Sequence, residues 1–379
     1  MSLLILTFFA VYGGMHVYAF FRARHALALG AWPAAGVAGF MLLMVLAPFL
    51  IRVLERNDYD LPARSLSSAA YLWMAGIFLF FCASLVLEAI NLVLRGAGWA
   101  AGAPGPAFII PARIFFFAAA GLAFGITLYG YVSAQTIRTE RLRIETAKLP
   151  AGIDRLKIVQ ISDVHLGLII REERLKKILT IVEAEKPDVF VSTGDLVDAQ
   201  INSMQGLAAL LRNVQAPHGK FAVTGNHEYY AGINEALKFT RDSGFRLLRG
   251  EAVQDNAITI AGVDDPAGAE FKIDKPEPEA ALLAGLPKDK FILLLKHRPL
   301  VDARASALFD LQLSGHTHKG QIYPFTYIVE IAYPLIAGKF DLPGGSILRV
   351  SRGTGTWGPP VRVLSPPEVT VVELVRRAR

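Results

Sequence analysis

Side chains that commonly bind metal ions recur along this sequence from residue 163 onward, each after a short apolar run. They are Asp163, His165, Asp195, Asn226, His227, His297, His316 and His318. The set combines imidazole, carboxylate and amide groups without a thiolate, which favours Mn, Fe or Zn over Ca or Mg. We expect a metal site here, with manganese as the first choice and iron or zinc as alternatives that ligand type leaves open.

The elements predicted around these residues would bring them together. The segments "LKIVQISD", "PDVFVSTGD", "KFAVTGNHE", "FILLLKH" and "LQLSGHTH" are each predicted to form a strand that ends at a polar position. The segment "REERLKKILTIVEAEKP" predicts an amphipathic helix with Leu175, Ile178, Leu179 and Val182 on one face. Loops at one end of a sheet converge in space, so these side chains are expected at one place.

The spacing within each motif suits a pair of neighbouring ions. In "DVH" and "HTH" one residue separates two donors, so both side chains can leave a tight loop toward different metals. Glycines precede Asp195, Asn226 and His316, and they let the backbone turn without a Cβ clash. Taken singly, a histidine at a strand end is more often a hydrogen-bonded structural residue than a ligand. The ordered set argues against that interpretation.

In their order, "SDVHLG", "GDLVD", "GNHE", "KH" and "GHTH" resemble the calcineurin-like metallophosphoesterase family, over roughly residues 155–320. The resemblance implies two facing mixed β-sheets flanked by helices, an αββα sandwich, and a dinuclear metal centre. It implies that one metal is held by Asp163, His165 and His318 and the other by Asn226, His297 and His316, with Asp195 bridging the pair. It also implies that His227 is the catalytic histidine near the leaving group.

A site of this kind would hydrolyse phosphate esters. Two cations about 3.5–4 Å apart lower the pKa of a bridging water, so that hydroxide can attack phosphorus at neutral pH. His227 could stabilise or protonate the departing oxygen. The chain is therefore expected to be a metal-dependent phosphoesterase.

The beginning of the chain has a different character, because four long apolar segments dominate residues 1–135. They cover 3–21, 32–53, 69–94 and 106–134, each near or above the roughly 20 residues that span a bilayer. Together they predict an all-α, four-helix transmembrane domain, in keeping with a chain that is 53% hydrophobic with a mean hydropathy of +0.39. The first segment has no basic stretch before it, so we expect it to stay attached and not to be cleaved as a signal peptide.

Three residues within these segments stand out. Glu88 lies well inside the third segment, where a carboxylate is costly, so a functional role and a structural polar contact both stay open. Arg113, near the start of the fourth segment, can snorkel toward the membrane surface. Cys82, the only cysteine, is expected to act as a small apolar residue.

The net charge of +6 is concentrated at the membrane flanks, which argues against a nucleic-acid partner. The first 150 residues hold 11 of the 39 Lys and Arg and 6 of the 33 Asp and Glu, so the remainder is near neutrality. By the positive-inside rule, the N-terminus and everything after residue 135 are expected in the cytoplasm, in an inner-membrane protein. We expect residues 136–150 to form a charged linker and residues 151–379 the catalytic domain.

The last part of the sequence bears on the substrate, which the sequence leaves open. The segment "YPFTYIVEIAYPLIAGKF" is either core or a surface for lipid or an acyl chain, Trp357 either shapes a pocket rim or packs in a turn, and Lys319 could contact a phosphate. A membrane-bound domain suits a phosphate ester or pyrophosphate of a lipid, with a UDP-diacylglucosamine-type pyrophosphate as one candidate. The alternatives are a phosphodiesterase or protein phosphatase for soluble substrates, and a non-enzymatic membrane binding or sensory module. Oligomeric state is not predicted.

Overall fold

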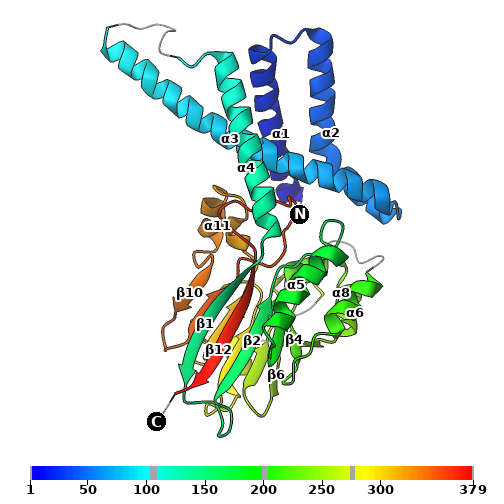
Figure 1. Ribbon diagram of the computed structural model, residues 1–379, viewed down its shortest axis with the longest axis vertical. Coiled ribbons are helices and arrows are strands. Elements are labelled where there is room, and N and C mark those ends of the chain that lie inside the picture. Colours follow the sequence, from blue (N-terminus) through cyan, green and yellow to red (C-terminus); the bar gives the residue numbers. More distant parts are fainter. Residues whose placement is uncertain (1, 103–108, 199–203, 274–277, 378–379) are drawn as a thin grey trace. The chain divides into compact units, whose positions relative to one another are not determined.

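The computed structural model describes residues 2–102, 109–198, 204–273 and 278–377 (Figure 1). The chain forms two compact units, one of Met1–Val132 with Gly358–Val363 and the other of Ser133–Trp357 with Leu364–Arg379. The first unit is helical, and the second carries the sheets and the predicted metal ligands.

The described N-terminal residues form the helices α1 (Ser2–Ala26), α2 (Ala31–Arg56), α3 (Asp60–Ala100) and α4 (Ala112–Gln135). Among the helices described, α2, α3 and α4 are long and apolar enough to cross a membrane, judged by length and composition. Three of the four predicted spans therefore correspond to candidate membrane helices, and α1 is not among them. Of the fourth predicted segment, residues 106–108 lie outside the described part, and the helix begins at Ala112.

Three charged side chains of the helical unit, Arg22, Glu88 and Arg113, have partners inside it. Arg22 on α1 forms an ion pair with Glu88 on α3, and its guanidinium lies 4.4 Å from the centre of the Phe115 ring. The Arg113 Nε donates a hydrogen bond to the carbonyl oxygen of Ala26 at 3.2 Å. A carboxylate in an apolar segment is tolerated when it is paired, so the structural interpretation of Glu88 accounts for this residue.

In the second unit, one mixed sheet has the strand order β1-β12-β2-β3-β4-β5 within the described residues. Its strands are β1 (Arg138–Thr146), β2 (Arg155–Ile161), β3 (Val189–Ser192), β4 (Lys220–Ala222), β5 (Arg246–Leu247) and β12 (Glu368–Arg376). Strands β2 to β5 run parallel, β12 is antiparallel to β2, and β1 is parallel to β12.

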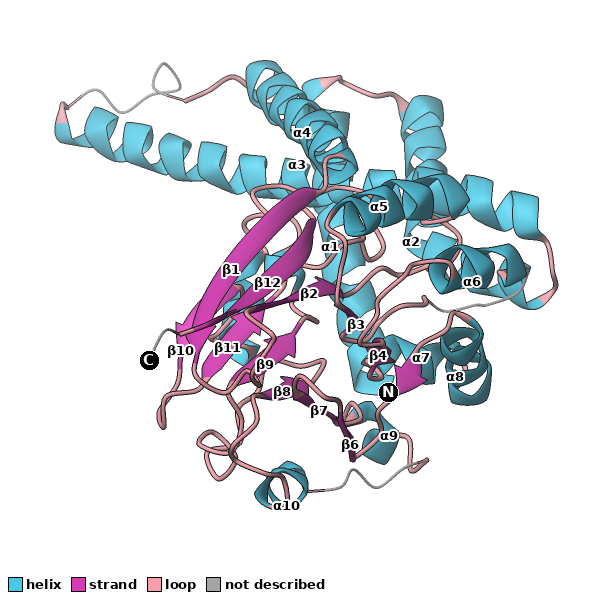
Figure 2. Cartoon of the chain, turned by 60° about the horizontal axis from the view of Figure 1, so that its bottom comes forward, coloured by secondary structure: helices cyan, strands magenta, loops and turns pink. Residues whose placement is uncertain are grey.

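The other described sheet has the order β10-β11-β9-β8-β7-β6, as Figure 2 shows below the first. Its strands are β6 (Glu251–Gln254), β7 (Thr259–Gly262), β8 (Ile292–Leu295), β9 (Leu311–Ser314), β10 (Gly338–Asp341) and β11 (Ile347–Val350). Strands β7, β8, β9 and β11 are parallel, with antiparallel strands at both edges. Both sheets are mixed, as predicted.

Three apolar layers hold the second unit together. Between the sheets, residues such as Ile158 and Val191 of the first pack with Leu293 and Leu313 of the second. The outer face of the first sheet packs on α5 (Glu172–Ala184), α6 (Gln205–Arg212) and α8 (Ile233–Asp242), and that of the second packs near α10 (Glu279–Ala284). Helix α5 buries the predicted face of Leu175, Ile178, Leu179 and Val182. This is the expected helix–sheet–sheet–helix arrangement.

Strand β1 occupies most of the segment for which the sequence predicts a linker, which corrects that prediction. Its nine residues pair in register with β12, from Arg138 opposite Glu368 to Thr146 opposite Arg376. The charges that suggest a linker belong to an edge strand: Arg352 pairs with Glu140, and Arg141 donates two hydrogen bonds to Glu185. Charged residues are common on edge strands because they discourage pairing with other chains.

Candidate metal centre

The predicted ligand residues follow parallel strands in both sheets. Asp163 and His165 come after β2, Asp195 after β3, His297 after β8, and His316 and His318 after β9, where His318 opens a short 3₁₀ turn (His318–Gly320). Asn226 and His227 begin α7 (Asn226–Ala231), shortly after β4. Because these loops leave the same end of adjoining strands, they converge as the sequence predicts.

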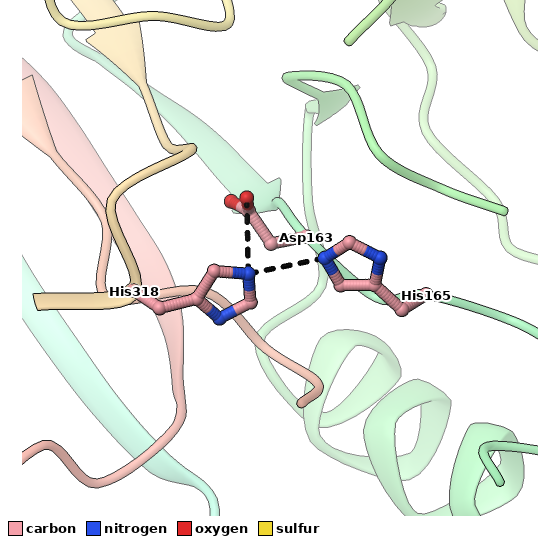
Figure 3. Close-up of side chains that lie close together, drawn as sticks. All are labelled: Asp163, His165 and His318. Atoms are coloured by element: carbon pink, nitrogen blue, oxygen red, sulfur yellow. Dashed lines mark hydrogen bonds and ion pairs between the residues drawn. The ribbon is translucent and has the colours of Figure 1, made fainter. Parts of the chain in front are cut away.

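One group of donors consists of Asp163, His165 and His318 (Figure 3). The Nε2 atoms of His165 and His318 are 3.0 Å apart, and the His318 Nε2 lies 3.5 Å from an Asp163 carboxylate oxygen. All three side chains are buried. Two imidazole nitrogens and a carboxylate oxygen that face one point are a donor set suited to a divalent transition metal.

A second group consists of Asp195, His297 and His316. The His297 Nε2 lies 3.2 Å from the Asp195 Oδ2 and 3.1 Å from the His316 Nδ1. The same Asp195 Oδ2 is 3.8 Å from the His165 Nε2 of the first group. The Asp195 carboxylate therefore lies between the two groups.

His227 lies against the Asp195 carboxylate, and Asn226 precedes it at the start of α7. The His227 backbone N–H donates to the Asp195 Oδ1 at 2.8 Å, and the His227 ring centre is 4.6 Å from that of His165. The buried Asn226 Oδ1 has no hydrogen-bond partner within the described residues. An orphaned buried oxygen is rare in proteins, and a bound cation would satisfy this one.

The backbone at the site is shaped for close approach. Asp163, Asp195 and His316 have φ values of 53°, 51° and 71°, in the left-handed region that non-glycine residues seldom occupy. A Cβ on Gly225 would lie 2.1 Å from the Asp195 Oδ1, and one on Gly315 would lie 2.1 Å from the Asp163 Oδ2. The positive φ values of the three non-glycine residues are a form of backbone strain. Such strain concentrates at functional sites, where the surrounding structure holds the backbone in place.

Two of the histidines are neutral at ordinary pH. Burial, and then the charge of His227, lowers the pKa of His165 to about 4. Burial, and then the charge of His297, lowers the pKa of His316 to about 3. A neutral imidazole has a lone pair available for a metal, so both residues are ready to act as ligands.

The carboxylates give the site its negative charge. Burial raises the pKa of Asp163 to about 6. Burial also opposes ionisation of Asp195, but the charges of His297 and His227 outweigh it and hold the pKa of Asp195 well below its usual range. In return, the Asp195 charge overcomes burial and raises the pKa of His297 to about 10. A proton on His297 thus neutralises the negative charge of Asp195, and a divalent cation bound between them could take the place of that proton.

Three further residues orient the site, and none of them is among the residues predicted from the sequence. The Asp198 Oδ1 is 3.0 Å from the His227 Nδ1, and the buried Glu228 accepts backbone hydrogen bonds from Gly225, Asp195 and Leu196. The Tyr333 hydroxyl is 2.9 Å from the His316 Nε2. Asp198 and Glu228 lie within the motifs "GDLVD" and "GNHE", which is a signal that could have found them. Tyr333 follows an apolar helix and has no such signal.

Lys319 and Trp357 lie beside the site. The Lys319 Nζ donates to the carbonyl oxygen of Leu364 at 3.4 Å. The Trp357 ring is half exposed, and its centre is 5.8 Å from that of His227. The Gln321 side chain fixes the Trp357 backbone through hydrogen bonds at both its N–H and its carbonyl, each at 2.9 Å.

Comparison with known proteins identifies the class to which this fold and site belong. Residues 156–320 match the family described as calcineurin-like phosphoesterase. An uncharacterized metallophosphoesterase of Aquifex aeolicus is 43% identical over 248 residues, which are 65% of this chain and 95% of that protein. The chain belongs to the calcineurin-like metallophosphoesterase family and is a metal-dependent phosphoesterase.

Other relatives match most of the chain or are named as transmembrane proteins. An uncharacterized metallophosphoesterase of Campylobacter jejuni is 29% identical over 373 residues, 96% of each chain. A zebrafish protein named "Transmembrane protein with metallophosphoesterase domain" is 30% identical over 263 residues, 66% of this chain and 60% of its own length. Together with the three apolar helices, the likeness to a protein named as a transmembrane protein supports membrane association.

Proposed function

We propose that this chain is an integral-membrane phosphoesterase with two divalent metal ions, acting on a phosphate ester or pyrophosphate of a lipid or lipid-linked molecule. One ion would be held by Asp163, His165 and His318, the other by Asn226, His297 and His316, with Asp195 shared. The observation that carries the two-ion assignment is the Asp195 Oδ2, which lies within 3.8 Å of a histidine nitrogen in each group.

The donor set fits these ions. It offers neutral imidazoles, carboxylates and an unpartnered amide oxygen, which favours manganese and is also compatible with iron or zinc. When bound, such ions neutralise the phosphate oxygens and make a water nucleophile available at neutral pH. The chain's own contribution is to hold the ligands rigidly, through backbone amides that donate to Asp163 and Asp195.

His227 is proposed as the acid for the leaving group. Its Nδ1 donates to Asp198, which leaves Nε2 as the atom that can give a proton to the departing oxygen. Burial opposes protonation, but the charge of Asp195 and the hydrogen bond to Asp198 raise the pKa of His227 to about 9. These interactions favour the protonated imidazole, which could give its proton to a departing alkoxide.

The membrane helices support a lipid substrate. Only two residues separate the end of α4 from the start of β1, so the catalytic unit is held close to the bilayer in which lipid phosphates lie. We place the catalytic unit on the cytoplasmic face, because basic residues flank α2 and α4 on the side that leads into it.

The test uses the full chain in lipid nanodiscs, loaded with Mn²⁺. Phosphate release is measured from a lipid pyrophosphate, a UDP-diacylglucosamine-type pyrophosphate, a lipid monophosphate and a soluble aryl phosphodiester, and bound metal is counted by mass spectrometry. We expect about two metals per chain, activity lost on chelation, and preference for a lipid substrate. In His227→Gln, turnover should fall by about 10²–10⁴-fold with both metals retained, whereas Asp195→Asn should lose metal.

Each result bears on a separate part of the proposal. Loss of metal in His227→Gln would make that residue a ligand and not the acid. Activity confined to the soluble diester would remove the lipid substrate and leave a membrane-anchored phosphodiesterase. A fully loaded chain that hydrolyses none of the panel would contradict the proposed substrate class.

A further inference from the structure

Helix α11 (Thr326–Ala332) and the turn before it expose an apolar surface next to the metal centre. None of the helix residues is buried. The exposed side chains are Tyr323, Phe325, Tyr327, Ile328 and Ile331, and Ile331 is 84% exposed. We call these five residues the α11 surface. A patch of large apolar side chains on one short helix is unusual in a solvent-facing position and indicates a partner.

The α11 surface lies at the end of the second unit where the chain enters from α4. The Thr326 hydroxyl donates to the carbonyl oxygen of Lys319, and the neighbouring His318 carbonyl accepts from the Ser365 hydroxyl. Two residues after Ser365, the Pro367 carbonyl accepts from the backbone N–H of Arg138, the first residue of β1. Figure 1 accordingly shows α11 near the beginning of β1.

The connection to the membrane helices is too short to let this end move far from a bilayer. Helix α4 ends at Gln135 and β1 begins at Arg138, so the link can span only about 10 Å when fully extended. The link therefore ties the C-terminal end of α4 to the start of β1, which is the end of the second unit that carries α11.

We propose that the α11 surface inserts into the interfacial layer of the bilayer that holds the apolar helices. Its composition fits this partner: three aromatic rings suit the headgroup level, and two isoleucines can reach the acyl chains. At the same end of the unit, Arg138 and Lys319 are placed to meet anionic headgroups.

Insertion would connect the bilayer with the reaction site. Tyr333 directly follows α11, and its hydroxyl contacts His316, so the helix and the metal centre are joined by a single residue. Trp357, fixed by Gln321, lies beside His227 and adjoins the same segment. The inference rests on the membrane anchoring in the proposed function and adds a route by which a lipid phosphate reaches the metals without leaving the interface.

A fluorescent label can measure the depth of this surface directly. In a Cys82→Ala background of the full chain, Ile331→Cys carries the label NBD, and the protein is placed in phosphatidylcholine–phosphatidylglycerol nanodiscs with or without doxyl-labelled lipid. The control is Asp154→Cys, whose native side chain is 91% exposed. Asp154 accepts a hydrogen bond from Arg376 at the far end of β12, about 26 Å along the strand from Glu368.

We expect the Ile331 label to emit at shorter wavelength and to be quenched by doxyl lipid, and the Asp154 label to do neither. Equal quenching at the two positions would overturn the inference. The Ile331 label could instead emit at shorter wavelength without being quenched by doxyl lipid, and lose this shift when each nanodisc holds one chain. That result would identify a contact between copies of the chain and would also overturn the inference.

An activity measurement separates this inference from the proposed function. Ile331→Glu should lower hydrolysis of a lipid phosphate in nanodiscs and leave the soluble phosphodiester unaffected, with Ile331→Leu as the conservative control. Unchanged lipid hydrolysis in Ile331→Glu would contradict the inference while leaving the phosphoesterase intact. Absence of metal-dependent hydrolysis in the unmodified chain would instead contradict the proposed function, whatever the depth of the label.

Discussion

At the residue scale, the Asp198 carboxylate controls the charge of the His227 imidazole. The two groups are 3.0 Å apart, and Asp198 is ionised because its hydrogen bond to His227 and the nearby imidazole charges outweigh burial and lower the pKa of Asp198. The carboxylate both fixes the ring orientation and favours the imidazolium over the neutral ring. Asp198 is thus a positioning residue that acts through His227.

The pH profile tests this relation. His227 acts as an acid when it is protonated, so activity should fall as pH rises through the pKa of His227, which is about 9. Bound cations lower that pKa, and the alkaline fall should therefore come at or below pH 9. In Asp198→Asn the negative charge is gone, so the fall should move to lower pH and kcat/KM at neutral pH should drop about 10–100-fold.

A matched control for that measurement exists elsewhere in the unit. Asp255 pairs with His218 at 2.5 Å, and its side chain is partly exposed, as that of Asp198 is. Asp255 and His218 do not belong to the metal centre. The Asp255→Asn variant should keep the unmodified pH profile for hydrolysis of a soluble diester. An unshifted profile in Asp198→Asn would show that this carboxylate does not act through the charge of His227.

The residues at the site differ in how far the sequence reveals them. The seven predicted ligands and His227 stand in short motifs at strand ends, where glycine and a polar donor together indicate a loop that approaches a neighbour. Tyr333 reaches His316 only because α11 folds back beside the site, and that depends on tertiary packing which no local pattern encodes. The ligand roles themselves stay predictions until metal is measured.

At the element scale, β12 carries a buried ionic network that joins the two sheets. The fully buried Glu368 lies 2.9 Å from an Arg349 guanidinium nitrogen on β11 and 2.8 Å from one of Arg352. Arg352 also reaches Glu140 on β1. A buried carboxylate of this kind is tolerated because both of its oxygens have cationic partners.

Breaking this network should destabilise the catalytic unit. The Glu368→Gln change removes the negative charge between two largely buried arginines, and we expect the free energy of unfolding to fall by about 3–5 kcal/mol. The control is Glu373→Gln on the same strand, where the partner Arg155 is exposed and the cost should be about 0–1 kcal/mol. Thermal melting of the two variants in nanodiscs compares them, and equal shifts would disprove the structural role of Glu368.

The pairing of β1 with β12 shows what the sequence could not predict at the scale of the elements. Strands β2, β3, β4, β8 and β9 are short apolar runs that end in motifs, and their positions follow from the pattern. Strand β1 alternates charged and apolar residues next to a membrane helix, and its only strand partner among the described residues, β12, begins at Glu368, far along the sequence. Pairing at that distance leaves no local signal, so a linker is the natural prediction.

At the scale of the whole molecule, the proposed cytoplasmic position of the catalytic unit can be measured with the Asp154→Cys variant in the Cys82→Ala background. In intact cells a membrane-impermeant maleimide should leave the cysteine at this exposed position unlabelled. After the membrane is opened, the maleimide should label the same cysteine. A cysteine placed at Trp32, in the first turn of α2, should show the opposite result, because Trp32 is 89% exposed and this end of α2 is separated from the catalytic unit by three apolar helices, an odd number. Labelling of Asp154→Cys in intact cells would reverse the proposed topology.

The order of strands in the first sheet also has a consequence for the synthesis of the protein. Strand β1 leaves the ribosome directly after the last apolar helix, but its partner β12 is made only after about 220 further residues. At about 5–20 residues per second, β1 waits roughly 10–45 s beside the membrane before it can pair. Its alternating arginines and glutamates keep the waiting segment hydrated, so the chain can finish translation before the sheet closes at its edge.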